Sequence, residues 1–517
     1  MNPLPAPNTF SRRQLLRRMG YAIGAVSAGH LLSACRSSGP ARRNDDRQSP
    51  QVIILGAGLA GLCAAYELER KGFHVTLLEA EKSHVGGRAR TLRFAGGRYG
   101  EAGAMRIPAK HDLTRGYCKE LGLTLRPFVQ SNPNAWLFAR GTKARHKDEA
   151  TIRNAFNLKG AEAAKSSDDL WAAVVVDRLN KMSPAEKADL LSSAPATPEF
   201  RATDQLSLQQ LFNQSGLSQD AIEFMATMQG QEAEMQYACT ESLREEMKEV
   251  WAHEFDEIVG GTDTLATAFA RRLKSEIRMG CEVISVEQTP QAARVIYRRG
   301  GSLQTLEAAH VLCTLPVPVM QRLDNLPTWS PEKQRAIRQL TYDSATKVLI
   351  GARRRFWELD DGIYGGGTFT DLPSASTYYP SDNATDRAGT GPRDAALSHT
   401  PSIFLASYSW GMTARRLGAL PHAQRLALVR RQLSKVHPQL ADDSQINASA
   451  SWAWDTHRWS GGAFAWFNPG QHATLYANLI APEGRVHFAG EHASLSHTWM
   501  QGAFESALRA VQEIASA

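Results

Sequence analysis

The stretch that most limits what this chain can fold into is residues 51–79, QVIILGAGLAGLCAAYELERKGFHVTLLE. A short apolar run of strand character leads into Gly56, Gly58 and Gly61, which have the spacing G-x-G-x-x-G, and helical spacing follows. Gly72 ends the helix, a second strand follows, and Glu79 closes it. The order strand, glycine turn, helix, strand and acid predicts a parallel βαβ unit that binds a dinucleotide, and therefore an α/β fold.

Each of these residues has a physical role in such a site. Gly56 makes the tight turn, Gly58 lets a pyrophosphate approach the backbone, and Gly61 lets helix and strand pack closely. The phosphates would lie on N–H groups at the positive end of the helix dipole. Glu79 would accept hydrogen bonds from ribose hydroxyls. The unit alone does not distinguish NAD from FAD.

A second informative stretch is GEAGAMRIPAKH at residues 100–111, where small residues and a methionine surround Arg106. An arginine in apolar surroundings needs an anionic partner, because an unpaired charge out of water is costly. Glu101 is the candidate within the chain, and a bound anion is the alternative.

Further motifs carry a resemblance to a known family. Gly86-Gly87-Arg88 follow the acid, CEVISVEQ occupies 281–288, ATKVLIG begins at 345, and FAGEHASLSHTW occupies 488–499. With GEAGAMRIPAKH, and in this order, these stretches resemble the flavin-dependent amine oxidases, and within them the L-amino acid oxidases. The similarity covers nearly the whole chain after its first segment, and the chain is expected to be an exported bacterial member.

The resemblance implies FAD as the cofactor, bound by segments from both chain ends and the middle. Ala463 stands where the monoamine oxidases have a cysteine bonded to the flavin, so FAD should be non-covalent; no metal is expected. The residues expected to hold FAD are Gly56, Ala57, Gly58, Gly61, Glu79, Ala80, Gly87, Arg88, Gly103, Ala104, Met105, Arg106, Val283, Trp454, Gly490, Glu491, Thr498 and Trp499.

The resemblance also assigns catalytic roles. Arg106 and Tyr408 align with the pair that binds the substrate α-carboxylate, and the fork of an arginine suits a carboxylate bidentately. Lys347 aligns with the lysine that holds a water against the flavin. The alternatives are a core tyrosine for Tyr408 and an edge lysine that reaches solvent for Lys347.

The rest of the substrate pocket is expected from aromatic residues and one acid. Trp499, with Thr498 beside it, and Phe464 should enclose the substrate, and Trp454 the flavin, although plain core packing is the alternative. Glu245, in ESLREEM, stands where venom-type L-amino acid oxidases have a histidine. A carboxylate there would favour a cationic side chain such as arginine or lysine, unless it lies on a solvated helix face.

The implied reaction is the oxidation of an L-amino acid by dioxygen to a 2-oxo acid, ammonia and hydrogen peroxide. An amine or polyamine oxidase, an amino acid 2-monooxygenase that makes an amide, and a non-catalytic FAD-binding lipoprotein are the alternatives. The formal net charge of +7 falls to +3 without the four arginines of residues 1–35, so no nucleic acid partner is expected. We expect a homodimer.

Residues 1–35 have the character of an export signal. Arg12-Arg13 followed by Leu15-Leu16 resembles the twin-arginine type, ahead of a short apolar run. Leu32-Ser33-Ala34-Cys35 resembles a lipobox, which predicts a periplasmic protein or one anchored in the membrane by lipid at Cys35; an ordinary signal peptide is the alternative. A twin-arginine substrate folds in the reducing cytoplasm, so the five other cysteines should be free, buried thiols.

The expected architecture is a Rossmann-like FAD-binding domain of the amine oxidase type, a mixed-sheet substrate domain and a helical insert. The expected boundaries are a signal at 1–35, a linker at 36–49, the FAD-binding domain at 48–130, 250–318 and 450–517, the helical domain at 131–249 and the substrate-binding domain at 319–449. Strands are expected at 347–352 and 403–408, and a helix at 422–436.

Overall fold

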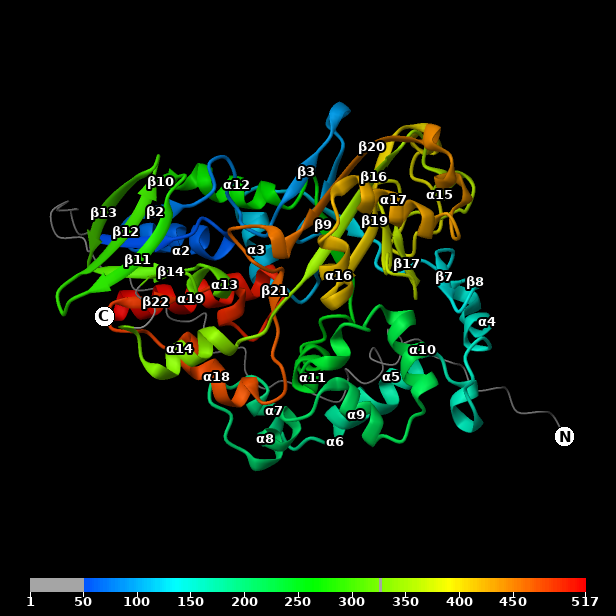
Figure 1. Cartoon of the computed structure of the whole chain (residues 1–517), viewed down its shortest axis with the longest axis horizontal. Helices are drawn as coiled ribbons and strands as arrows, with labels where there is room; N and C mark the ends of the chain where they lie inside the picture. Colours follow the sequence, from blue (N-terminus) through cyan, green and yellow to red (C-terminus); the bar gives the residue numbers. More distant parts are fainter. Residues whose placement is uncertain (1–50, 325–327) are drawn as a thin grey trace.

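The computed structural model describes residues 51–324 and 328–517, arranged around two sheets at opposite ends of the molecule (Figure 1). The expected signal, its twin arginines and Cys35 lie outside the described residues. The five described cysteines, at 63, 118, 239, 281 and 313, are free and buried, as expected. The α/β fold class is also confirmed, because both sheets are layered with helices.

The first sheet is parallel and is built from distant parts of the chain. Its strands, in order, are β10 (Glu276–Met279), β2 (His74–Glu79), β1 (Gln51–Leu55), β14 (His310–Cys313) and β22 (Val486–Phe488). The three segments expected to form the FAD-binding domain therefore meet in one sheet. The central strand β1 is apolar from Val52 to Leu55 because helices at 59–70 and 500–516 cover one face of the sheet and strands from residues 282–308 lie against the other.

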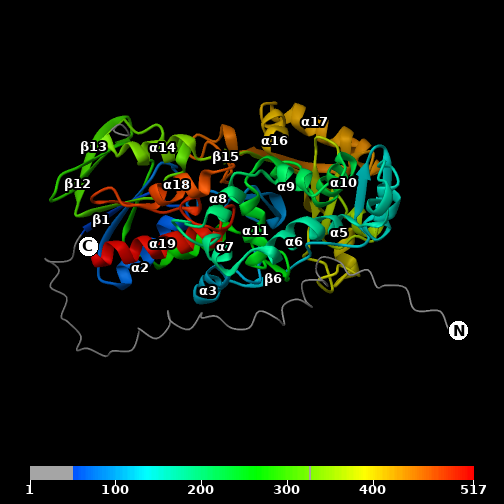
Figure 2. The same ribbon diagram turned by 90° about the horizontal axis from the view of Figure 1, so that it is seen from below.

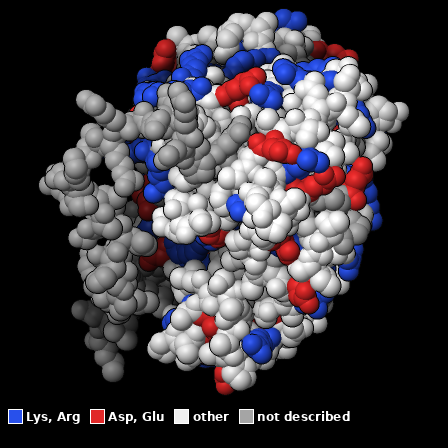
Figure 3. Space-filling view, turned by 90° about the vertical axis from the view of Figure 1, so that its left-hand side faces the viewer, with Lys and Arg blue, Asp and Glu red and all other residues white. Residues whose placement is uncertain are grey.

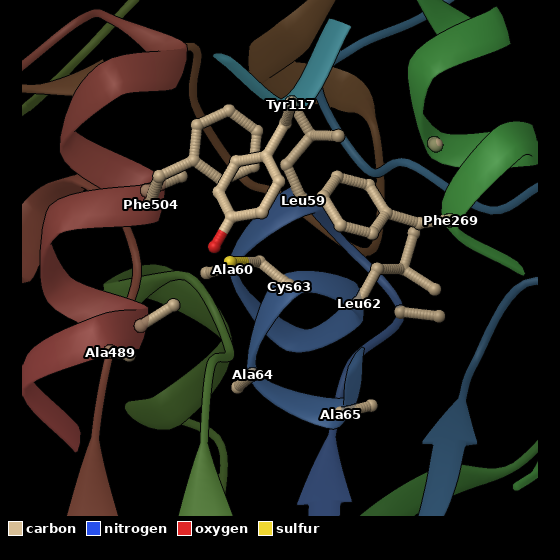
Figure 4. Close-up of a cluster of buried hydrophobic side chains, with 14 of the residues drawn as sticks. Leu59, Ala60, Leu62, Cys63, Ala64, Ala65, Tyr117, Phe269, Ala489 and Phe504 are labelled. Atoms are coloured by element: carbon tan, nitrogen blue, oxygen red, sulfur yellow. The ribbon is translucent and has the colours of Figure 1, made fainter. Parts of the chain in front are cut away.

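Helix α2 (Leu59–Arg70) follows the glycine turn and is almost entirely buried on its inner face. Figure 4 shows Leu59, Leu62 and Cys63 of this helix among the rings of Tyr117, Phe269 and Phe504. These rings belong to α3 (Asp112–Glu120), α12 (Asp263–Arg272) and α19 (Met500–Ser516), in that order. Figure 2 shows α19 running alongside α2, so the last helix of the chain packs on the first described one.

The second sheet has seven strands and is mixed. In order, they are β20 (Ile446–Ala453), β16 (Ala345–Ala352), β19 (Ser402–Trp410), β18 (Ser376–Tyr379), β17 (Gly366–Thr370), β7 (Trp136–Ala139) and β8 (Thr142–Arg145). Helices α16 (Gly411–Gly418) and α17 (His422–Leu433) pack on it. Both expected strands and the expected helix of this region are confirmed.

A helical segment lies beneath the second sheet in Figure 1. Its helices are α4 (Glu149–Arg153), α5 (Ser167–Trp171), α6 (Asp177–Lys181), α7 (Pro184–Asp189), α8 (Pro198–Asp204), α9 (Leu208–Gln214), α10 (Gln219–Gln229) and α11 (Cys239–Met247). A π-helical turn at Ala172–Val176 joins α5 to α6. Ser166, Ser183 and Ser207 cap three of these helices with capping boxes, which explains where they begin.

The packing differs from the expected boundaries in three places. The expected helical domain, 131–249, begins with β7 and β8, a hairpin whose turn is Arg140-Gly141 with both φ angles positive. The boundary expected at 450 falls inside β20, which pairs with β16. The first part of the expected substrate domain, 319–449, packs its α14 (Pro331–Gln339) on α18 (Gln471–Ile480), beside the parallel sheet.

Two further features concern the surface and the smaller sheets. Among residues 51–324 and 328–517, no helix combines the length and apolar character needed to cross a bilayer. On the face in Figure 3, basic and acidic side chains are interspersed over the uncovered part. Smaller sheets join the large ones: β11 (Glu282–Gln288), β12 (Ala293–Arg299) and β13 (Ser302–Ala308) form one, and β5 (Ile107–Pro108), β9 (Phe255–Ile258) and β6 (Leu125–Phe128) another.

Candidate functional site

A cavity of about 460 Å³ extends from the glycine turn after β1 to strands β16 and β19. It is lined by residues from nearly every segment expected to contribute to the site. All the expected site residues line it except Ala57 and Gly61. The structure therefore brings the expected cofactor and substrate residues to one place.

The glycine turn forms one end of this cavity. Gly58 has φ −71°, which any residue could adopt, and a Cβ there would meet nothing within 4 Å, so its small size serves the open cavity. A Cβ on Gly61 would lie 2.1 Å from the Gly56 carbonyl oxygen, so that glycine serves the contact between helix and strand. Helix α2 has no side-chain cap and no acid in its first turn, which suits an anion at its N-terminus.

Glu79, at the end of β2, is buried beside this turn. Its carboxylate accepts the Ala57 N–H at 2.7 Å and the Glu81 N–H at 2.8 Å, one on each oxygen. Burial raises the pKa of Glu79, and these N–H groups oppose that shift. The carboxylate is fixed at the cavity wall, where it can accept from ribose hydroxyls. This end of the cavity fits a dinucleotide.

Arg88 and Glu491, which are about four hundred residues apart in the sequence, form an ion pair at the cofactor end of the cavity. Arg88 Nη1 donates to Glu491 Oε1 at 2.6 Å and to the Ala463 carbonyl at 3.0 Å. Glu491 also accepts the Ala465 N–H at 3.0 Å and the Thr498 N–H at 3.1 Å. Although burial opposes ionisation, Arg88 keeps the pKa of Glu491 below its ordinary value. The charges at this end are therefore paired within the protein.

Arg106 lies at the other end and is 9% exposed. Its Nη1 donates to Gln130 Oε1 at 2.9 Å, and its guanidinium lies 4.9 Å from the Trp251 ring centroid and 5.4 Å from that of Tyr378. Within the described part of the chain, no carboxylate lies within salt-bridge distance of it. Glu101, the alternative partner, instead accepts from the Thr91 hydroxyl and the Thr262 N–H. The guanidinium is left to bind an anion from the cavity.

Lys347 on β16 and Tyr408 on β19 are paired across the sheet and converge beside Arg106. Lys347 Nζ donates to the Gly103 carbonyl at 2.6 Å and lies 4.4 Å from the Tyr408 ring centroid. Burial lowers the pKa of Lys347, with Glu101 opposing and Arg106 adding to the effect. Burial raises the pKa of Tyr408 to about 12, so its hydroxyl keeps its proton and can donate.

Glu245 of α11 faces the same cavity. The sequence alone did not decide between this position and a solvated helix face. Glu245 Oε1 accepts the indole N–H of Trp499 at 2.8 Å, and its Oε2 accepts that of Trp251 at 2.7 Å. It is therefore not on a solvated helix face. Trp499 and Phe464 line the cavity as expected, and the Trp454 indole donates to the Ala102 carbonyl at 2.9 Å.

Sequence reasoning missed several lining residues. Trp410 lies two residues after Tyr408 on the same strand, so period-two alternation would have placed both on one face. Glu234 and Trp251 come from short turns with no sequence signal, and both line this cavity. Glu234, Trp251 and Trp410 also line a second cavity of about 1700 Å³, between the helical segment and the second sheet, which extends from Arg106.

Comparisons with known proteins give matches over most of the chain. Residues 59–515 match the family model described as flavin containing amine oxidoreductase. The L-amino-acid oxidase of Echis ocellatus is 31% identical over 475 residues, covering 90% of this chain and 88% of that protein. The L-amino-acid oxidase of Siganus canaliculatus is 32% identical over 477 residues, covering 90% and 85%.

A solved structure has a similar fold over most of the chain. A putrescine oxidase bound to putrescine superposes with a TM-score of 0.71 at 18% identity, covering 91% of this chain and 99% of that one. At this identity the match bears on the fold alone, and the fold is the one that the sequence predicted.

Proposed function

The chain belongs to the flavin containing amine oxidoreductase family, as expected from its motifs, and from this premise we propose that it oxidises an L-amino acid with non-covalent FAD. The reaction converts the amino acid, dioxygen and water into a 2-oxo acid, ammonia and hydrogen peroxide. The observation that carries the substrate class is Arg106, a buried guanidinium facing the cavity with an amide oxygen and aromatic faces around it. The L-amino-acid oxidases above support the same activity.

The residues of the substrate end would hold the amino acid for reaction. Arg106 binds the α-carboxylate bidentately and the Tyr408 hydroxyl donates to it, which fixes the orientation of the α-carbon. Lys347, with one donor on Gly103, holds a water with another. Phe464, Trp410 and Trp499 exclude bulk water from the reacting centre. When bound, the flavin supplies the two-electron acceptor.

FAD is the cofactor that this cavity suits. Backbone N–H groups and Gly58, which line the cavity, would receive the pyrophosphate, Glu79 would bind the ribose, and Val283 would bind the adenine. Ala463 offers no nucleophile, and its carbonyl accepts from Arg88, which supports non-covalent binding.

The side chain of the substrate is cationic in this proposal. Glu245 lines the cavity that also holds Arg106, and Glu234 provides a second carboxylate at the junction with the larger cavity. A carboxylate has about four acceptor positions, so one that holds two indoles can still accept from an ammonium or guanidinium group. Trp251 and Trp499 add aromatic surface for the same cation.

The test is a peroxide assay of the purified protein across the common L-amino acids. Turnover of arginine or lysine, with a 2-oxo acid as product, is expected. Lysine should react and cadaverine, its decarboxylated analogue, should not; the reverse would indicate an amine oxidase. An amide product would indicate a monooxygenase, and no loss of yellow colour with any substrate under anaerobic conditions would indicate a non-catalytic protein.

Arg106→Met tests the carboxylate role directly. Activity should fall by about 30-fold to several thousandfold while the flavin remains bound, because a charged hydrogen-bonded pair is lost. Arg425→Met is the matched control, since Arg425 is equally buried but donates only to Ser451 and to backbone carbonyls on the far side of the sheet. Unchanged turnover in Arg106→Met would contradict the proposal.

Export is the remaining part of the proposal. Residues 1–35 direct the folded protein through the twin-arginine route, with lipid attached at Cys35, and the mature protein forms a homodimer. Five buried thiols support folding in a reducing compartment. Replacing Arg12 and Arg13 by lysine should leave the protein in the cytoplasm; continued export would contradict the route. Cys35→Ala should release it from membranes, and size-exclusion chromatography measures the dimer.

A further inference from the structure

Residues 494–499, between η11 (Glu491–Ala493) and α19, carry two wall residues of the cavity, Thr498 and Trp499. Thr498 has φ 70°, a left-handed conformation that is strained for a β-branched residue. Such a residue keeps that conformation only when its surroundings hold it. One contact comes from the cavity side, where the Thr498 N–H donates to Glu491 at 3.1 Å.

Helix α11 supplies further contacts to this segment. Glu241, Glu245 and Lys248 are four and three residues apart, so they share one face of the helix and its C-cap. Glu241 Oε1 lies 3.0 Å from His497 Nδ1, and Glu245 Oε1 accepts from Trp499. Lys248 Nζ donates to the Leu495 carbonyl at 3.0 Å and to Ser496 Oγ at 2.8 Å.

Two of these three residues have no part in the cavity itself. Glu241 and Lys248 are absent from the lining of both cavities described above, although they contact residues within four positions of Trp499. Glu241 is 3% exposed and is braced by Arg244 Nη1 at 2.9 Å and by the Phe467 N–H at 3.2 Å. Arg244 in turn donates to the Leu190 carbonyl, so this face of α11 is fixed within the helical segment.

We propose that Lys248 and Glu241 are positioning residues, which hold residues 495–499 in the strained conformation that places Trp499 and Thr498 at the substrate. The geometry makes α11 a rigid support: three side chains on one helix face bind three consecutive positions, Leu495 to His497, and also Trp499 Nε1, within a segment that no sheet stabilises. When Lys248 is removed, the segment relaxes toward ordinary backbone angles. The wall then moves, while the cofactor end, held by Arg88 and Glu491, does not.

The effect on catalysis rests on the proposed function, but the effect on the segment does not. The first measurement is therefore hydrogen–deuterium exchange of the flavin-loaded full-length protein, in peptides that cover 494–500. Lys248→Met should raise exchange there at least about fivefold, without raising it in β1 or β22. The matched control is Lys333→Met, because Lys333 Nζ, like Lys248 Nζ, donates to two oxygen atoms, here the carbonyls of Leu479 and Ala481, but lies away from the site. It should leave exchange in 494–500 unchanged.

The second measurement uses any substrate that the protein accepts. In Lys248→Met the KM should rise about tenfold while kcat changes less than about threefold, because the wall binds the substrate and the flavin end is intact. Lys248→Arg, which keeps the donors, should restore both parameters, and Glu241→Gln should raise KM in the same way. If Lys248→Met does not fold, Ser496→Ala replaces it as the test, because it removes the hydroxyl that accepts from Lys248 and donates to Glu505 Oε2 at 2.9 Å; Glu505→Gln is then the control for the loss of that second contact.

Unchanged exchange in 494–500 in both Lys248→Met and Ser496→Ala would overturn the proposal. A Lys248→Met protein with raised exchange in 494–500 but with the KM of the unaltered protein would also overturn the proposal. The segment would then move without affecting the wall. A protein that turns over no amino acid would instead contradict the proposed function, and the exchange result would still decide whether α11 holds the segment.

Discussion

The two ends of the cavity are built in different ways. At the cofactor end the donors are mainly backbone N–H groups, and the charges are paired, with Arg88 2.6 Å from Glu491. At the substrate end the binding groups are side chains, and Arg106 has an amide oxygen and aromatic rings around it. At the cofactor end, Arg88 and Glu491 balance each other's charge without any bound molecule. The substrate end is arranged so that the substrate supplies the missing charge.

A single added side chain at the cofactor end should abolish FAD binding. Gly58→Val places a branched side chain in the open space that the pyrophosphate would occupy, since nothing else lies within 4 Å of its Cβ. We expect the purified variant to be colourless and inactive, while its fold remains, as measured by flavin absorbance and circular dichroism. Gly116→Val is the control, because Gly116 in α3 lies outside the cavity, has no positive φ and also has nothing within 4 Å of an added Cβ. A yellow Gly58→Val protein would contradict the assignment.

A substitution at the substrate end should change the selectivity between basic and apolar amino acids. Glu245→Gln removes the negative charge but keeps one oxygen for an indole N–H. We expect kcat/KM for arginine or lysine to fall about 10–100-fold, and that for leucine to change less than about threefold, because charge-assisted hydrogen bonds contribute about 1.5–3 kcal/mol. An equal loss for all substrates would mean that Glu245 serves only to hold Trp251 and Trp499.

The smallest expected effect is on stability. Burial lowers the pKa of Lys347 in the folded protein, from an ordinary value near 10.5. At pH values between the lowered pKa of Lys347 in the folded protein and its ordinary pKa in the unfolded chain, the unfolded chain binds more protons. The free energy of unfolding should therefore rise with pH across that interval. Lys347→Met should remove this slope and stabilise the protein at neutral pH by about 1 kcal/mol, as measured by urea unfolding.

Arg88→Met gives the contrast at the cofactor end. It would leave the buried Glu491 without its cation, so we expect destabilisation there instead of stabilisation. Destabilisation by both substitutions would show that the two ends do not differ in how their charges are compensated.

This difference also explains how much the sequence could predict. The glycine turn, Glu79 and Arg88 lie in one continuous stretch whose spacing carries the physical reason for each residue. Arg106 could be singled out because a charge stood in apolar surroundings. Trp251 and Glu234 could not, since each lies in a short turn and only the packing of the helical segment brings it to the cavity.

The fold follows the same rule. β1 and the buried part of β2 are mainly apolar runs that the sequence shows directly, whereas the place of the β7–β8 hairpin in the second sheet depends on β17, more than two hundred residues further along. The Arg140-Gly141 turn was a local signal for that hairpin. No local pattern could indicate that α14 packs beside the parallel sheet.

The order of strands in that sheet has a consequence for biosynthesis. β1 emerges from the ribosome early, but its neighbour β14 comes after about half of the chain, and β22 and α19 come last. The nucleotide-binding turn therefore stays without its final wall until β22 and α19 have been synthesised, so cofactor loading must follow synthesis of residues 486–516. Contacts of such long sequence separation also make folding slow. A pause between synthesis and any later step of maturation is thus built into the topology.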